Sequence, residues 1–239
     1  MNTNKNSYTL IYATVMVVIV ALMLALVSSS LKGIQTANVE LDKKKQILSS
    51  LNISPEGQDA AALYDKYIVK ELVINSKAEV LSDVKGDAFK LDYIKELAKK
   101  IEERQLPLYV AEVDGATKYI VPLRGAGLWG PIWGYIALNE DRNSVYGTFF
   151  SHASETPGLG AEIAYPAFQQ QFVGKRIFND SNDFVSIAVM KAGQVSDKQD
   201  QIDAISGGTI TSKGVEQMLL NCIGQYEAYL KISNGGTEE

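Results

Sequence analysis

The stretch Leu108-Tyr-Val-Ala-Glu-Val-Asp-Gly-Ala-Thr-Lys-Tyr-Ile-Val-Pro-Leu123 decides the fold. It places the pair Asp114-Gly115 between two segments that are rich in β-branched and aromatic residues. An Asp-Gly pair favours a two-residue hairpin turn, because both positions of that turn need a positive φ. We therefore predict antiparallel strands at 108–113 and 118–123.

A second hairpin is predicted after the first, with strands at 131–138 and 144–150 across the polar residues 140–143. Another strand is expected at 184–190. Helices are expected at 60–68, 89–101, 161–172 and 212–230. Pro166 should disturb or end the third of these helices, and Ser212 should cap the last. These elements predict one α+β domain with antiparallel hairpins and flanking helices.

The composition excludes several classes of protein. The chain has 239 residues, a formal net charge of −5 and 46% hydrophobic residues, which suits one ordinary globular domain. A nucleic-acid-binding protein would need a basic surface to neutralise phosphates. The single cysteine, Cys222, closes no internal disulfide and disfavours a structural zinc site or an iron–sulfur cluster. The single histidine, His152, disfavours zinc catalysis that relies on several histidines.

A long apolar segment lies near the N-terminus. Residues 6–31 contain no Asp, Glu, Lys, Arg or His, and the stretch 10–27 is apolar. A helix needs about 20 such residues to cross the hydrocarbon core of a membrane. The segment is longer than the apolar part of a signal peptide, and Ser28-Ser29-Ser30 is a poor cleavage site. We predict an uncleaved transmembrane helix rather than a signal peptide or a buried helix.

This anchor sets the expected domain organisation. We predict an N-terminal tail at 1–8, a transmembrane helix at 9–31, a juxtamembrane helix or stalk at 32–55, a globular domain at 56–232 and a disordered tail at 233–239. The lysines on the two sides of the anchor do not settle its orientation. Because the anchor has no ionisable side chain, any ion pathway must lie in other subunits.

The first segment with a chemical pattern is Asp203-Ala-Ile-Ser-Gly-Gly-Thr-Ile-Thr-Ser212, just before the last predicted helix. Gly207 and Gly208 permit a sharp turn and a close ligand. Hydroxyl side chains crowd the same turn, and a helix N-terminus favours a phosphate group. A helix cap with an ordinary turn would account for the same residues.

The second segment is His152-Ala-Ser-Glu-Thr-Pro-Gly-Leu-Gly160. Pro157-Gly158 suits the central positions of a type II turn. Such a loop would present Glu155 and Thr156 to a planar polar ligand, or it is simply a tight connection. A His–Glu metal pair is a further alternative, but two ligands are too few.

The third segment is Leu123-Arg-Gly-Ala-Gly-Leu-Trp-Gly-Pro-Ile-Trp-Gly134, with four glycines and two tryptophans in twelve residues. Strands rarely carry so many glycines unless the backbone bends or a ligand approaches closely. We expect Trp133 in the core, and Trp129 free to pack on a ligand.

Together, the anchor and the three segments resemble the FMN-carrying NqrC subunits of the Na+-translocating NADH:quinone reductases and their relatives, the RnfG subunits of the Rnf electron-transport complex. The resemblance covers nearly the whole chain. Ser206-Gly-Gly-Thr-Ile-Thr-Ser212 resembles the flavinylation motif of that family, with Gly208 where the usual motif has Ala. The pattern Leu128-Trp-Gly130 and the full length favour the NqrC type.

The resemblance implies FMN attached covalently to Thr209 by a flavin transferase, which moves FMN from FAD onto the threonine as a phosphoester. Asp203 would orient the turn or help hold the metal of the transferase. Ser206 and Thr211 would donate to phosphate or ribityl oxygens. The other implied FMN-binding residues are Gly207, Gly208, Trp129, Glu155, Thr156, Gly158, Leu159 and Gly160.

The resemblance also implies a membrane-anchored electron-transfer subunit of a respiratory complex in the bacterial inner membrane, with the soluble domain on the periplasmic side. The NADH and quinone sites would lie on other subunits, because we expect neither a G-x-G-x-x-G dinucleotide motif nor a dinucleotide-type βαβ unit in this chain. The alternatives are an Rnf-type subunit, a membrane-anchored sensor or binding module for a free small ligand, and a hydrolase. The hydrolase would use Ser206 or Thr209 with His152 as base, but it lacks a nucleophile elbow. We expect a structural role for His152 and burial for Cys222.

Overall fold

The computed structural model describes residues 6–196 and 198–231, and the predicted tail at 233–239 lies outside this range. The chain forms two units, of which the first ends at Lys43 and the second begins at Lys44. Helix α1 (Asn6–Ser50) supplies the first unit and contributes 44–50 to the second. By length and composition α1 can cross a membrane. The predicted span at 9–31 and residues 32–50 of the predicted stalk at 32–55 therefore lie in one helix.

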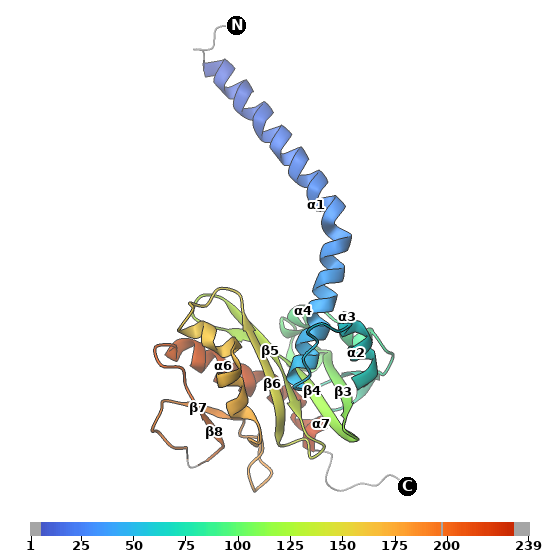
Figure 1. Cartoon of the computed structure of the whole chain (residues 1–239), viewed down its shortest axis with the longest axis vertical. Coiled ribbons are helices and arrows are strands. Elements are labelled where there is room, and N and C mark those ends of the chain that lie inside the picture. Colours follow the sequence, from blue (N-terminus) through green and yellow to red (C-terminus); the bar gives the residue numbers. More distant parts are fainter. Residues whose placement is uncertain (1–5, 197, 232–239) are drawn as a thin grey trace. The chain divides into compact units, whose positions relative to one another are not determined.

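The second unit is built on a six-stranded antiparallel sheet in the order β2-β1-β3-β4-β5-β6, of which Figure 1 labels β3 to β6. Its strands are β1 (Ile68–Ile74), β2 (Val80–Ser82), β3 (Leu106–Val113), β4 (Ala116–Ala126), β5 (Pro131–Leu138) and β6 (Val145–His152). A small parallel pair is formed by β7 (Ala188–Met190) and β8 (Gln201–Asp203). Both predicted hairpins are confirmed, since β3 pairs with β4 and β5 pairs with β6.

The turn of the first hairpin has the backbone that its sequence requires. Asp114 has a φ of 52° and Gly115 a φ of 77°, and Val113 pairs with Ala116 directly across the turn. Two successive positive φ values are those of a type I′ turn, which matches the right-handed twist of the two strands.

The variant Gly115→Ala is expected to lower the free energy of unfolding by about 1 kcal/mol, because alanine must adopt a positive φ there. Thermal unfolding of the full chain in detergent measures this loss. Asp114→Asn is the matched control, since asparagine tolerates the left-handed region. Equal stability of Gly115→Ala and the unaltered chain would contradict the turn assignment.

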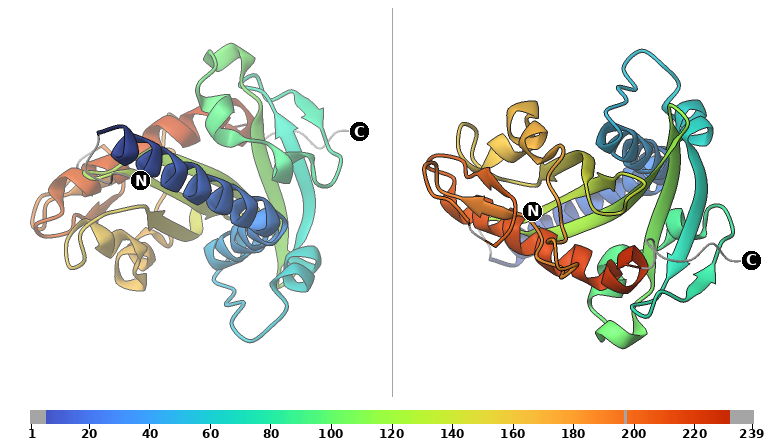
Figure 2. Two further views of the ribbon diagram at one scale, coloured as in Figure 1. Left: turned by 90° about the horizontal axis from the view of Figure 1, so that it is seen from above. Right: turned by 90° about the horizontal axis from the view of Figure 1, so that it is seen from below.

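The sheet is covered on both faces, and the side chains of its strands alternate between two cores. Leu106 and Leu108 of β3 belong to the core that also contains Val215, Leu219 and Ile223. The other core joins further side chains of β3 to the end of α1, including Ile47 and Leu48. Figure 2 shows helix α6 (Thr209–Ile223) lying along one face of the sheet, where it contacts β4.

The remaining elements are short. The α-helices are α2 (Ala60–Tyr67), α3 (Asp87–Lys90), α4 (Tyr93–Leu97), α5 (Pro166–Gln169) and α7 (Glu227–Lys231). Single 3₁₀ turns are η1 (Ile101–Glu103), η2 (Gly160–Ala164), η3 (Gln170–Phe172) and η4 (Gly224–Tyr226).

Two of the predicted helices are interrupted. The helix at 89–101 was expected to be continuous, which is wrong, whereas the prediction that Pro166 disturbs the helix at 161–172 is confirmed. The predicted helix at 89–101 is divided between α3, α4 and η1, because Asp92 begins a new helix by accepting the N–H of Lys95 at 3.3 Å. The predicted helix at 161–172 is divided at Tyr165, which is extended ahead of Pro166. A residue before proline is pushed out of the helical region by the proline ring, so the division has a local cause.

The last predicted helix begins earlier and ends earlier than expected. It starts at Thr209 with Gly208 as N-cap, so the prediction that Ser212 caps it is wrong. The Ser212 hydroxyl lies within the first turn and accepts the N–H of Ile205 at 3.0 Å. This bond fixes the turn that contains Gly207 and Gly208.

Strand β1 was not predicted, because Lys70 and Glu71 interrupt its apolar pattern. Glu71 is nevertheless buried, where it accepts hydrogen bonds from the Tyr64 hydroxyl at 3.0 Å and from the N–H of Gly86 at 2.8 Å. A carboxylate is tolerated there because folding supplies these donors. The strand predicted at 184–190 is confined to β7, since Ser186 has a φ of 59°.

Candidate functional site

The three segments selected from the sequence meet at one cavity of about 230 Å³. The turn after β4, the loop after β6 and the start of α6 supply its walls. The lining residues are Leu128, Trp129, Glu155, Thr156, Leu159, Gly160, Gly207, Gly208, Thr209, Ile210 and Thr211. We call this space the ring cavity.

A buried carboxylate ties the three segments together. Glu155 is only 5% exposed, and its Oε2 accepts the hydroxyl of Thr211 at 2.5 Å while its Oε1 accepts the N–H of Trp129 at 2.8 Å. The N–H of Glu155 donates to Nδ1 of His152 at 3.1 Å. The side chain thus holds the β4–β5 turn and α6 against its own loop.

Two glycines leave room for this carboxylate. A Cβ atom at Gly127 would lie 2.5 Å from Oε1 of Glu155, and a Cβ at Gly160 would collide with Oε2 and with the Thr211 hydroxyl. Any larger residue would displace Glu155. The glycine-rich stretch therefore serves close packing of the backbone on a buried side chain, as well as the bend between β4 and β5.

The loop after β6 contains the predicted turn. The N–H of Leu159 donates to the carbonyl of Thr156 at 3.1 Å, and Gly158 has a φ of 75°. These are the features of a type II turn with Pro157 and Gly158 in the centre, so that prediction is confirmed. At Gly207, which has the same φ, a Cβ would lie 2.7 Å from the Leu159 side chain. The two turns therefore pack directly against each other.

Exposed apolar side chains surround the mouth of the ring cavity. Trp129 is 65% exposed, Ile210 59% and Leu159 41%, although each of them lines the cavity. Leu128 is also exposed there. Neighbouring exposed apolar side chains at a cavity are typical of a ligand-binding surface. This rim suits a planar, largely apolar group, while the threonines and backbone amides suit its polar edge.

A second cavity of about 380 Å³ lies on the other side of the turn that precedes α6. It shares Gly207 and Thr209 with the ring cavity, and we call it the lysine cavity because Lys191 and Lys213 line it. Its remaining walls are Val189, Met190, Ala192, Gln194, Ala204, Ile205, Ser206 and Ser212. Thr209 is exposed and stands between the two spaces.

The structure brings together most of the predicted site residues. Nine of them line the ring cavity: Trp129, Glu155, Thr156, Leu159, Gly160, Gly207, Gly208, Thr209 and Thr211. Ser206 lines the lysine cavity, and Gly158 shapes the neighbouring turn. Asp203 lines neither cavity, and its N–H donates to Gln171 at 2.9 Å. The Thr211 hydroxyl donates its hydrogen bond to Glu155, so in this structure Thr211 stabilises the wall of the ring cavity.

Sequence reasoning missed Gly127, Leu128 and Ile210 as parts of the site. The first two stand in the glycine-rich stretch, where the number of glycines was the available signal. The expectation that the chain has no G-x-G-x-x-G stretch is wrong, since Gly125-Ala-Gly-Leu-Trp-Gly130 has that spacing. This stretch lies at the end of β4 and in the turn to β5, without the βαβ unit that a dinucleotide site requires.

The lone histidine, cysteine and second tryptophan have structural positions. His152 accepts the N–H of Glu155, as expected for a hydrogen-bonded structural residue. Cys222 is buried against Arg124, and burial raises the pKa of its thiol, so it stays neutral. Trp133 was expected in the core but is half-buried, because its indole N–H donates to Gln46 at 3.2 Å.

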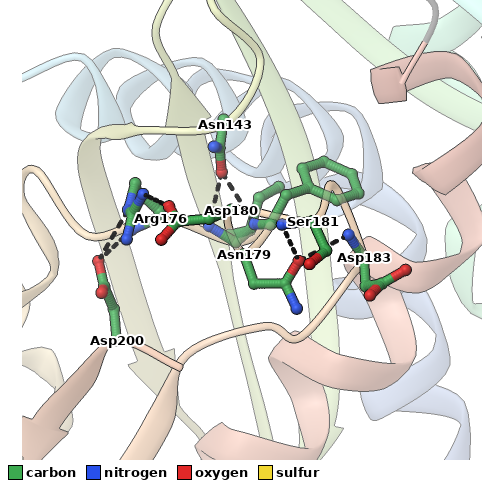
Figure 3. A network of polar contacts seen from close by, with 9 residues as sticks. Asn143, Arg176, Asn179, Asp180, Ser181, Asp183 and Asp200 are labelled. Atoms are coloured by element: carbon green, nitrogen blue, oxygen red, sulfur yellow. Dashed lines mark hydrogen bonds and ion pairs between the residues drawn. The ribbon is translucent and has the colours of Figure 1, made fainter. Parts of the chain in front are cut away.

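A further cavity of about 640 Å³ is polar, and residues that line it form hydrogen bonds and ion pairs with one another (Figure 3). Arg176 pairs with Asp180 at 2.6 Å, and its backbone N–H donates to Asp200 at 2.7 Å. Asn179 accepts the N–H groups of Ser181 and Asp183. These contacts hold a surface loop in shape. Among the described residues, no cluster of His, Cys, Asp and Glu that could hold a metal ion is present.

Comparisons with known proteins agree with this geometry. Residues 127–224 match the FMN-binding domain family, a range that includes all lining residues of the ring cavity. The chain is 32% identical, over 98% of both chains, to the NqrC subunit of the Na(+)-translocating NADH-quinone reductase of Haemophilus ducreyi. It is 30% identical, over 96% of both chains, to that of Pseudomonas aeruginosa. The crystal structure of this subunit from Parabacteroides distasonis is similar, with a TM-score of 0.79 and 46% identity over 85% of this chain and 98% of that chain.

Proposed function

Because this chain belongs to the NqrC family of subunits of the Na(+)-translocating NADH-quinone reductases, we propose that it is the FMN-carrying electron-transfer subunit of such a complex. One observation carries this proposal. The ring cavity gathers the three motif segments and places the hydroxyl-bearing residue Thr209 on its wall. The NADH and quinone sites would then belong to other subunits.

The residues at the two cavities fit FMN. A pocket for a whole ligand measures roughly 300–1,000 Å³, so the ring cavity alone, at about 230 Å³, suits only the flavin ring. Trp129, Leu159 and Ile210 supply exposed apolar surface for a planar ring. When bound, FMN supplies the redox chemistry, while the protein sets its position and surroundings. Glu155 holds these parts of the wall together.

We further propose that FMN is attached covalently through Thr209. In this step the Thr209 Oγ bonds to the FMN-side phosphorus of FAD, the phosphoanhydride bond breaks, the hydroxyl proton is released and AMP leaves. A flavin transferase catalyses the transfer. Thr209 is suited to the reaction because it is exposed and stands at the start of α6, where the helix dipole stabilises an anionic ester.

The expected partners follow from the same assignment. Helix α1 would anchor the chain in the bacterial inner membrane, where the other subunits of the complex carry the ion pathway, since α1 itself presents no ionisable side chain over 6–31. The FMN-binding domain would lie on the periplasmic side. Asp203 would help to position the turn or the metal of the transferase during modification.

The full chain coexpressed with its flavin transferase tests this proposal. We expect a band that fluoresces under ultraviolet light on a denaturing gel, and an intact mass higher by one FMN less one water. Fragmentation by mass spectrometry should place the added mass on Thr209 rather than on Ser206, Thr211 or Ser212. A dark band at the unmodified mass, with a transferase that modifies a control protein, would contradict it and favour a binding module for a free ligand.

The role of Trp129 is separable from stability. Because its side chain is largely exposed, Trp129→Ala should change the free energy of unfolding by no more than about 0.5 kcal/mol. The backbone bond to Glu155 is kept. We expect the fluorescence of the native, flavin-loaded protein to rise, because an indole in contact with a flavin quenches its emission. Trp133→Ala is the control, and equal fluorescence of all three proteins would place the ring elsewhere.

A further inference from the structure

The lysine cavity places cationic side chains beside the proposed flavin acceptor. Lys213 and Thr209 line this cavity together with Lys191, which directly follows β7. Lys213 and Thr209 both belong to α6, and residues four apart lie on the same face of a helix. Lys213 therefore lies one turn of helix after Thr209 on the same face of α6.

The Lys213 ammonium forms an exposed ion pair on its own helix. It pairs with Oε2 of Glu216 at 2.7 Å, and the Lys213 side chain is 56% exposed. Oε1 of Glu216 accepts the N–H of Val189 at 2.9 Å, which fixes the carboxylate on the wall strand β7. An exposed ion pair contributes little to stability, so this lysine can turn to another anion without loss of the fold.

We propose that the lysine cavity takes up the phosphate of the FMN attached to Thr209, and that Lys213 neutralises its negative charge. The inference rests on the proposed function, and it assigns the two cavities to two parts of one cofactor. The ring cavity has exposed apolar residues at its rim, while the residues that line the lysine cavity include Lys191, Lys213 and Ser206. Thr209 lines both, so an ester on its oxygen lies where the two spaces join.

The experiment compares Lys213→Gln and Lys213→Arg with the unaltered full chain in a single-turnover transfer assay with FAD and the transferase. The matched control is Lys231→Gln, which breaks another helical ion pair, with Glu227 at 2.7 Å, on the separate helix α7. We expect Lys213→Gln to slow the transfer about ten-fold, equivalent to about 1.4 kcal/mol. Lys213→Arg and Lys231→Gln should stay near the rate of the unaltered chain.

A second readout separates the phosphate from the transferase. The ³¹P resonance of the purified, flavin-loaded protein should shift in Lys213→Gln and keep its position in Lys231→Gln. Slower transfer with an unchanged ³¹P resonance would mean that Lys213 contacts the transferase, and would overturn the proposal. Equal rates and resonances in all variants would also overturn it while leaving the FMN assignment intact. If the unaltered chain takes up no FMN, the proposed function itself fails.

Discussion

The Thr209→Val variant is expected to carry no covalent flavin under conditions in which the unaltered chain is fully modified. Valine has the shape and the β-branch of threonine but lacks the hydroxyl that forms the ester. Thr209 is exposed, and no hydrogen bond of its side chain is present within the described part of the chain. The variant should therefore fold normally. In-gel fluorescence and intact mass measure the loss.

The serine variant gives the matching control. Thr209→Ser keeps a hydroxyl at the same place, so it should regain covalent flavin, at a reduced rate because serine fixes its oxygen less firmly than threonine. Ser206→Ala should be modified as fully as the unaltered chain, since its hydroxyl is not the acceptor. Flavin on Thr209→Val, with the added mass on Ser206 or Thr211, would show that the acceptor assignment is wrong.

The Glu155→Ala variant is expected to have the largest effect on stability. It leaves the Trp129 N–H and the Thr211 hydroxyl without their acceptor and opens a cavity beneath Gly127 and Gly160. Each unsatisfied buried group costs about 1–3 kcal/mol, so we expect a loss of roughly 2–4 kcal/mol. For a domain of this size, that corresponds to a fall in melting temperature of roughly 5–15 °C.

The same variant should also bind flavin poorly. Without the Glu155 carboxylate, no hydrogen bonds from Trp129 and Thr211 hold the three segments around the ring cavity together. Glu155→Gln should be intermediate, since the amide keeps one acceptor oxygen but turns an NH₂ group toward a donor. Glu162→Ala is the control in the neighbouring turn η2, where the carboxylate is less buried and accepts the N–H of Gly158 at 3.1 Å. The melting temperature and the extent of flavin transfer are measured for both variants. If Glu155→Ala equals Glu162→Ala in both, Glu155 does not hold the walls of the ring cavity together.

Much of the fold was predictable because its signals are local. The Asp114-Gly115 turn, the second hairpin and the apolar N-terminal helix each depend on the backbone preferences or the hydrophobicity of adjacent residues. Predictions failed where a distant contact decided the outcome. Strand β1 was not predicted, because its residues Lys70 and Glu71 are charged. Glu71 can be buried there only because Tyr64 and Gly86 donate hydrogen bonds to it in the folded chain.

The candidate site divides in the same way. The sequence selected the three segments, and the resemblance to a flavoprotein family supplied a role for Thr209, since a short motif keeps its residues together. Glu155, however, stabilises the site through hydrogen bonds from Trp129 and Thr211, which lie far from it along the chain. The lysine cavity likewise needs β7 beside α6.

The sequence by itself determined an anchored α+β chain with a hydroxyl-rich turn before its last helix, and it indicated the chemistry of that turn. Only the tertiary structure decided that the turn separates an apolar-rimmed cavity from one lined by lysines, and that a buried carboxylate joins the surrounding loops. The physical reason is that turn preferences and apolar length act between neighbours. Burial and hydrogen-bond satisfaction depend instead on segments that come together only when the chain packs.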